Sequence, residues 1–165
     1  MKEETNKIIA EWKGKSNDDL SSIRQFLSLI QKPGSNIRFE DILDAHTDIF
    51  SKFDCLLCAN CCKTTPPIFT NRDVKRIAQY LGTTPRQFKR KYTIEDINGE
   101  LIGIKVPCSF LNDDHSCSIY EVRPEACITY PHTDDPEYNS RAELNYNNTL
   151  VCPAAYAIVK MLSAE

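Results

Sequence analysis

The sequence lacks any apolar run near the roughly 20 residues that a bilayer-spanning helix needs. Glycine is scarce, with 5 among 165 residues, which excludes collagen-like repeats. Residues 1–15 contain no apolar core followed by a small-residue cleavage site, so no secretory signal is expected. Neither sign of charge dominates: the formal net charge is -3, which gives no general attraction to nucleic acid. We therefore expect a cytoplasmic protein with no membrane partner.

The apolar content and the number of cysteines both indicate the class of protein. Hydrophobic residues make up 41% and charged residues 26%, which is typical of a globular domain and excludes a disordered chain. The 8 cysteines stand out in a chain of this length. In a reducing compartment, such an abundance favours metal or redox chemistry over a disulfide framework.

The apolar periodicity predicts a helix-rich chain. Residues 1–15 predict a marginal helix or an arm. Helices over 16–31 and 37–50 are expected to pair antiparallel, and two more are expected over 70–82 and 84–92. The segments 54–63 and 133–149 are interpreted as loops, 66–69 and 117–120 as extended, and 123–127 as one helical turn. Residues 93–106 predict a β-hairpin with an Asn98-Gly99 turn, and a last helix starts at Pro153.

These elements predict a small single α+β domain, helix-rich with a short β-hairpin, organised around a multi-cysteine metal centre. Residues 1–51 are expected to form an N-terminal helical segment packed on the core. Residues 52–165 are expected to form the cysteine-cluster domain, and the whole is treated as one structural unit.

The cysteine spacing carries the chemistry. Four cysteines fall within eight residues, and the others are distributed along the second half of the chain: Cys55, Cys58, Cys61 and Cys62, then Cys108, Cys117, Cys127 and Cys152. Cysteines three residues apart are poorly placed for a mutual disulfide. Thiolates are soft ligands that select zinc, copper(I) or iron–sulfur clusters. We therefore predict all eight as candidate ligands, with Cys55, Cys58, Cys61 and Cys62 as the candidate cofactor-binding core.

The spacing leaves two kinds of centre open. Cys-x2-Cys is the usual half of a tetrahedral zinc site, and eight thiolates would suffice for two such sites. Alternatively, Cys55, Cys58 and Cys61 have the spacing of a ferredoxin-type run, and Cys152-Pro153 copies its closing Cys-Pro. The cofactor is thus predicted as zinc or an iron–sulfur cluster, without a choice between them.

Several separate sequence segments, taken in order, resemble the motifs of the CxxCxxCC (YkgJ-like) family of zinc- or iron-chelating domain proteins. The segments are the cysteine run from Cys55 to Cys62, Pro107-Cys108-Ser109-Phe110-Leu111, the stretch from Cys117 to Cys127, and Tyr130-Pro131. The resemblance covers about residues 52–153 and implies that the cysteines occupy the family's cysteine positions. The family usually has Gly where this chain has Ala59; Gly adopts a positive φ at low cost, and the neighbouring Asn60 can also do so.

Other functions remain as alternatives. An iron–sulfur or iron-dependent redox or modifying enzyme of unknown substrate is one, and a metal-free thiol redox sensor is another; no catalytic residue is assigned. His46, His115 and His132 are interpreted as structural or solvated, with a nitrogen ligand or a proton shuttle as the alternative for His132. Arg123 is expected to bond carbonyls or a carboxylate near the site. The basic stretch 72–91 could face an anionic partner, although a solvated helix face is the plainer interpretation, and no clear nucleic-acid motif is present.

Overall fold

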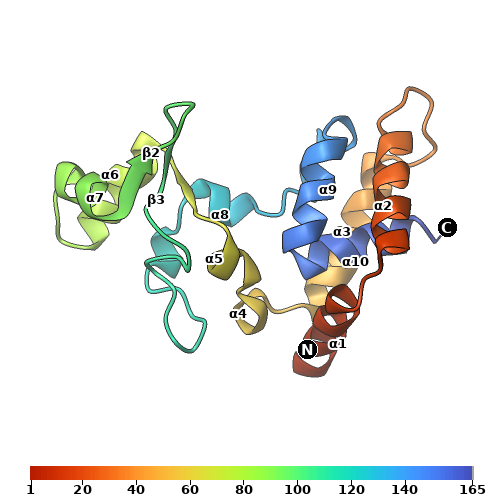
Figure 1. The fold of residues 1–165 in the computed structure, drawn as a ribbon, viewed down its shortest axis with the longest axis horizontal. Helices are drawn as coiled ribbons and strands as arrows, with labels where there is room; N and C mark the ends of the chain where they lie inside the picture. The colour runs from red at the N-terminus through yellow and green to blue at the C-terminus, as the bar shows by residue number, and fades with distance from the viewer. Residues whose placement is uncertain (165) are drawn as a thin grey trace. The chain divides into compact units, whose positions relative to one another are not determined.

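The structure is a computed structural model that describes residues 1–164, and it confirms a helix-rich fold with a small antiparallel sheet (Figure 1). The chain forms two compact units. The first, which we call the terminal unit, combines residues 1–58 with the segment from Pro131 onward. The second, the central unit, comprises residues 59–130. Among the described residues, no helix combines the length and the apolar character that crossing a membrane requires.

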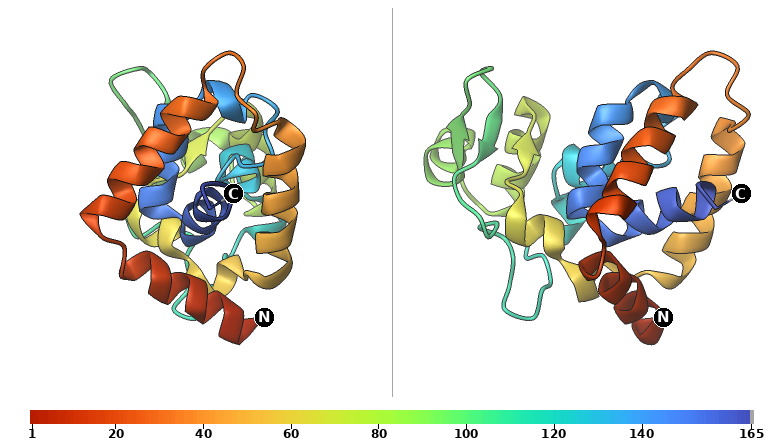
Figure 2. Two further views of the ribbon diagram at one scale, coloured as in Figure 1. Left: turned by 90° about the vertical axis from the view of Figure 1, so that its right-hand side faces the viewer. Right: turned by 45° about the vertical axis from the view of Figure 1, so that its right-hand side comes forward.

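The terminal unit is built around its last helix. Its elements are α1 (Lys2–Lys13), α2 (Asn17–Ile30), α3 (Phe39–Lys52), the single turn α4 (Cys55–Cys58), the 3-10 turn η2 (Tyr138–Ser140), α9 (Ala142–Val151) and α10 (Pro153–Leu162). Helix α10 contacts α1, α2, α3 and α9, and Figure 2 shows it among them. Because α10 is surrounded, most of its side chains are buried, including Tyr156, Ile158 and Val159. This apolar core organises the unit.

Two predictions within the terminal unit were wrong. The helices expected to pair with each other, α2 and α3, pack instead on α9 and α10 respectively. Residues 133–149, expected as loop, contain most of α9. Asparagine is a poor helix former, but the buried amides of Asn145 and Asn148 donate to the carbonyls of Tyr138 (2.6 Å) and Pro131 (2.9 Å). Tertiary hydrogen bonds therefore compensate for the weak local propensity.

The central unit alternates short helices with a small sheet. Its elements are α5 (Asn60–Thr64), β1 (Ile68–Phe69), α6 (Asn71–Tyr80), α7 (Pro85–Tyr92), β2 (Thr93–Glu95), β3 (Leu101–Gly103), the 3-10 turn η1 (Tyr120–Val122) and α8 (Glu125–Thr129). Thr70 and Thr84 close capping boxes at the starts of α6 and α7. The segment 54–63, expected as loop, instead forms α4 and most of α5.

The predicted hairpin is confirmed and gains a third strand. The strand order is β1-β3-β2, all antiparallel, and Gly99 has a φ of 78° in the connecting turn. The register places Ile68, Ile102 and Ile94 in one cross-strand row, while the neighbouring Phe69 lies on the opposite, buried face.

A single apolar cluster supports the sheet and helices of the central unit. It consists of Phe69, Val74, Ile77, Ala78, Phe88, Phe110 and Ile119. Cys108 and Cys117 pack against this cluster. Two of the predicted ligands are therefore held by the core rather than by a mobile loop.

Candidate metal centre

Four cysteines of the central unit form one electrostatically connected group, although they come from four separate segments. Cys62 lies on α5, Cys108 follows the hairpin, Cys117 lies between Phe110 and η1, and Cys127 lies on α8. We call these four the central cysteine group.

Backbone hydrogen bonds join the segments that carry these cysteines. The N–H of Cys108 donates to the carbonyl of Cys62 at 2.8 Å, which ties the segment after the hairpin to α5. Cys117 forms an isolated antiparallel bridge with Leu111, and the N–H of Ser118 donates to the carbonyl of Phe110 at 2.9 Å. The chain from Cys108 to Cys117 thus turns back on itself. The backbones that carry Cys62, Cys108 and Cys117 are therefore joined although they are separated in sequence.

A half-buried ion pair fixes the segment that leads to Cys127. Asp73 on α6 is 1% exposed, and its Oδ1 accepts from Arg76 Nη2 at 2.7 Å and from the N–H of Glu125 at 3.2 Å. The Arg76 guanidinium also donates to the carbonyl of Arg123 at 2.8 Å. Because Arg123 and Glu125 flank the start of α8, this contact, which we call the Asp73–Arg76 clamp, positions the helix that carries Cys127.

The central group has raised thiol pKa values. Desolvation by burial, followed by the charges of Cys62, Cys108 and Cys117, raises the pKa of Cys127 to about 12. Burial, with a smaller contribution from Cys62, also raises the pKa of Cys108 and Cys117. For Cys62, the contact with Cys61 is the largest cause of a raised pKa. Although the Cys127 residue is partly exposed, its thiol is therefore protonated at neutral pH.

Arg123 supplies positive charge beside this group, as expected from the sequence. Its Nη1 donates to the carbonyl of Tyr120 at 2.9 Å, and its guanidinium lies over the Tyr120 ring, 4.0 Å from the centroid. The charge of Arg123 acts to lower the pKa of both Cys117 and Cys127. A cation in this place offsets part of the repulsion between thiolates.

Three further cysteines, Cys55, Cys58 and Cys152, belong to the terminal unit. Burial raises the pKa of Cys152 to about 12, and the charges of Cys55 and Cys58 add smaller contributions in the same direction. Cys152 is the N-cap residue of α10, whose first backbone N–H groups oppose the shift. We call these three the terminal cysteine group.

The loop that carries Cys55 is tied to α1. The hydroxyl of the buried Thr5 donates to the carbonyl of Lys52 at 3.3 Å and accepts from the N–H of Asp54 at 2.9 Å. Asp54 in turn accepts from the N–H of Leu56 at 2.8 Å, which starts α4. Residues 1–15 were predicted as a marginal helix or an arm. In the structure, α1 fixes the backbone next to Cys55, the first of the predicted ligands.

Cys61, the remaining predicted ligand, lies on α5 beside Cys62, and the two Sγ atoms are 3.9 Å apart. Ala59, immediately before α5, is buried and has a φ of 48°. This is the left-handed region, in which a residue with a Cβ is strained by about 1–2 kcal/mol. Ala59 itself therefore adopts the positive φ, and Asn60 is helical.

All eight cysteines are free thiols. Across residues 1–164, no three His, Cys, Asp or Glu side chains are positioned as a group that could hold one. The residues fit a metal by their donor chemistry, because the cysteines supply soft sulfur atoms from several segments. Cys108 and Cys117 pack against the core of the central unit, and the Arg123 cation acts on Cys117 and Cys127. Of the predicted non-ligands, His46 is structural, since its Nδ1 lies 2.8 Å from Thr133 Oγ1 and its ring lies 4.6 Å from that of Phe50.

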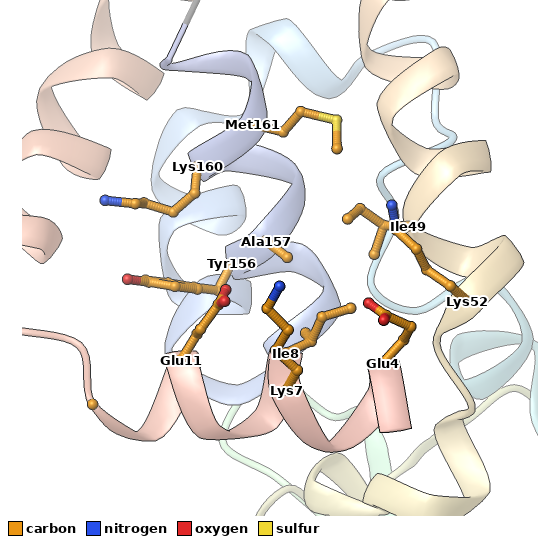
Figure 3. Close-up of a pocket in the computed structure, with 11 residues that line it drawn as sticks. Glu4, Lys7, Ile8, Glu11, Ile49, Lys52, Tyr156, Ala157, Lys160 and Met161 are labelled. Carbon is orange, nitrogen blue, oxygen red and sulfur yellow. The ribbon is translucent and has the colours of Figure 1, made fainter. Parts of the chain in front are cut away.

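A separate cavity of about 580 Å³ lies in the terminal unit between α1, α3 and α10 (Figure 3). Ile8, Ile49 and Tyr156 contribute apolar surface, Lys52 points toward the cavity, and Lys160 lies at its edge and points away from it. Both of these lysines already form ion pairs, with Asp48 and Asp19 respectively. No cysteine lines the cavity, so it is distinct from both cysteine groups.

A small helix-rich fold with eight free cysteines is typical of cysteine-rich metal-chelating domains. The chain belongs to the CxxCxxCC family, described as a "putative zinc- or iron-chelating domain", whose pattern matches residues 54–153. No curated protein matches the chain, and no solved structure does either.

Proposed function

We propose that this protein coordinates zinc or an iron–sulfur cluster through its two cysteine groups. The central group, Cys62, Cys108, Cys117 and Cys127, supplies four thiolates to one centre, the number that a structural zinc site uses. The terminal group, Cys55, Cys58 and Cys152, supplies three donors to a second centre. Cys61, beside Cys62, is the remaining donor that the proposal includes.

One observation carries this proposal: hydrogen bonds fix the four segments that carry the central cysteine group, although these segments lie far apart in sequence. Deprotonating all four thiols would set their negative charges against one another, so they stay protonated when no cation is present. A bound cation converts the repulsion into attraction and contributes to folding free energy. Membership in a zinc- or iron-chelating family supports the same conclusion.

The raised pKa values favour metal binding over a metal-free redox sensor. A peroxide-sensing cysteine needs a lowered pKa because the thiolate is the reactive form. Cys62, Cys108, Cys117, Cys127 and Cys152 all have raised pKa values. A metal ion can displace a thiol proton on binding, whereas peroxide would meet mostly protonated sulfur. A redox or modifying enzyme requires the further finding that the centre contains iron.

The test is the metal content of single-cysteine variants of the full chain, purified without oxygen. We expect Cys108→Ala and Cys127→Ala to lose the same metal equivalent, because both belong to the central group. Cys152→Ala should retain that equivalent and lose the one held by the terminal group. Ser109→Ala, beside Cys108, serves as the control and should match the unmodified protein. Unchanged stoichiometry in both central-group variants would refute the proposal.

A visible spectrum of the same samples distinguishes the two kinds of centre. A colourless protein that contains zinc indicates a structural site, and a brown protein bleached by reductant indicates an iron–sulfur cluster. A folded, metal-free protein whose thiols oxidise reversibly would instead support the redox sensor.

A further inference from the structure

Helices α6 and α7 concentrate positive charge on a protein that is otherwise acidic. Seven of the 20 Lys and Arg residues fall between residues 71 and 92, but only one of the 23 Asp and Glu residues does. That one, Asp73, is buried in the Asp73–Arg76 clamp, so it offers no carboxylate to solvent. The net charge of the whole chain is -3, which makes this concentration local.

Several of these cations have no counter-charge. Arg72, Lys75, Arg86 and Arg90 are exposed, and within residues 1–164 none of them forms an ion pair. We call these four, together with Lys91, the basic face. Unpaired like charges on two adjacent helices repel one another, so an anionic partner would relieve a real electrostatic cost.

The basic face has a rigid support. Capping boxes at Thr70 and Thr84 fix the starts of both helices, and Phe88 of α7 is fully buried in the core cluster. In the view of Figure 1 the two helices lie next to each other, and contacts between α6 and α7 confirm this arrangement. A partner would therefore bind without ordering the helices first, which lowers the entropic cost of association.

A recess with a mixed polar and apolar lining lies within this charged surface. A cavity of about 520 Å³ is lined by Leu81, Phe88 and Tyr92 together with Thr83, Gln87, Arg90 and Lys91. Leu81 at its edge is 36% exposed and Tyr80 is 54% exposed, so apolar surface remains uncovered beside the cations. The space is sufficient for one large apolar side chain whose flanking residues would lie among Arg86, Arg90 and Lys91.

The aromatic residues favour a protein over single-stranded nucleic acid as the partner. Stacking of bases requires exposed ring faces. Tyr80 is the one exposed ring of α6 and α7, since Phe88 is buried and Tyr92 packs on Phe88 and Phe110, with ring centroids 5.2 Å and 4.8 Å away. Lys91 also lies over the Tyr92 ring at 5.0 Å, so successive bases would find no row of exposed rings to stack on. We infer that the basic face binds an acidic segment of a partner protein, with one large apolar side chain in the recess and its carboxylates on Arg86, Arg90 and Lys91.

Selection of a displayed random peptide library for binding to the full-length protein tests this inference. We expect selection of peptides that combine several Asp or Glu residues with one large apolar residue. A fluorescent copy of the selected peptide should bind with an affinity that falls as salt is raised. The double variant Arg86→Glu/Arg90→Glu should weaken binding by about tenfold or more, and Arg86→Gln/Arg90→Gln by less. Leu81→Gln should reduce the preference for the apolar residue.

The matched control is Lys2→Glu/Lys13→Glu, which makes the same change in charge at exposed positions of α1. It should leave peptide binding unchanged, and circular dichroism should show that every variant is folded. Selection of no acidic peptide, or equal weakening by the α1 control, would overturn the inference. Tighter binding of single-stranded RNA than of any selected peptide, lost in Arg86→Glu/Arg90→Glu, would overturn it in favour of nucleic acid.

Discussion

Replacing the buried Asp73 with Asn tests whether the Asp73–Arg76 clamp positions α8. The two carboxylate oxygens of Asp73 accept hydrogen bonds from different donors. Oδ2 accepts from the N–H and the hydroxyl of Thr70, at 2.9 and 2.6 Å. Oδ1 accepts from the Arg76 guanidinium and from the N–H of Glu125. Asn has the same shape but only one oxygen. If that oxygen keeps the Thr70 capping box, the amide NH2 faces the donors of Arg76 and Glu125.

The expected cost follows from those lost contacts. Leaving a buried donor without its acceptor costs about 1–3 kcal/mol, and breaking a buried ion pair costs more. The Arg76 side chain is 37% exposed, so water recovers part of its loss. We therefore expect Asp73→Asn to destabilise the central unit by about 3 kcal/mol, which corresponds to a Tm lower by roughly 10 °C.

Thermal unfolding followed by circular dichroism measures this effect, with Asp113→Asn as the control because Asp113 is exposed in a turn. A second readout is the rate at which a coloured chelator removes metal, which should rise in Asp73→Asn because Cys127 is no longer held in place. An Asp73→Asn protein within about 0.5 kcal/mol of the control, with an unchanged rate of metal removal, would refute the role of the clamp.

Three other predictions concern backbone strain and the effects of pH. Ala59→Gly should raise the free energy of unfolding by about 1 kcal/mol, because Ala59 sits at a φ of 48° that Gly adopts without strain; a lower Tm than the parent would contradict this. Because the pKa of Cys127 is raised to about 12, metal binding near neutral pH should release protons and tighten as pH rises, and calorimetry in buffers of different ionisation enthalpy measures the release. The metal-free protein should lose stability as pH rises from 9.0 toward about 12, since the folded state keeps Cys152 protonated above its ordinary pKa; Cys152→Ala should flatten that decline.

Local signals allowed most helices to be predicted from the sequence. Ser16 and Thr70 each begin a capping box that the structure contains, Pro85 opens the next helix, and Asn98-Gly99 forms the predicted turn. These features depend on residues within about four positions of one another, so no tertiary information is needed.

The failures have tertiary causes. Helix α9 depends on amide bonds from Asn145 and Asn148 to distant carbonyls, which no local pattern indicates. The packing of α2 on α9 was missed because adjacency in sequence was taken as adjacency in space. For the candidate site, residue types and spacing identify the cysteines, but their division into a central and a terminal group follows from the chain's long-range path. The sequence gives one indication of the Asp73–Arg76 clamp: Asp73 is the only acidic residue in the basic stretch 72–91.

The central claim, that these cysteine groups hold a soft metal, is tested most directly by elemental analysis of the full-length protein purified without oxygen. The account predicts zinc or iron bound to folded protein and lost, together with thermal stability, when the central cysteines are replaced. Folded protein that contains neither metal, and whose Tm does not change when zinc or iron is added, would contradict the account.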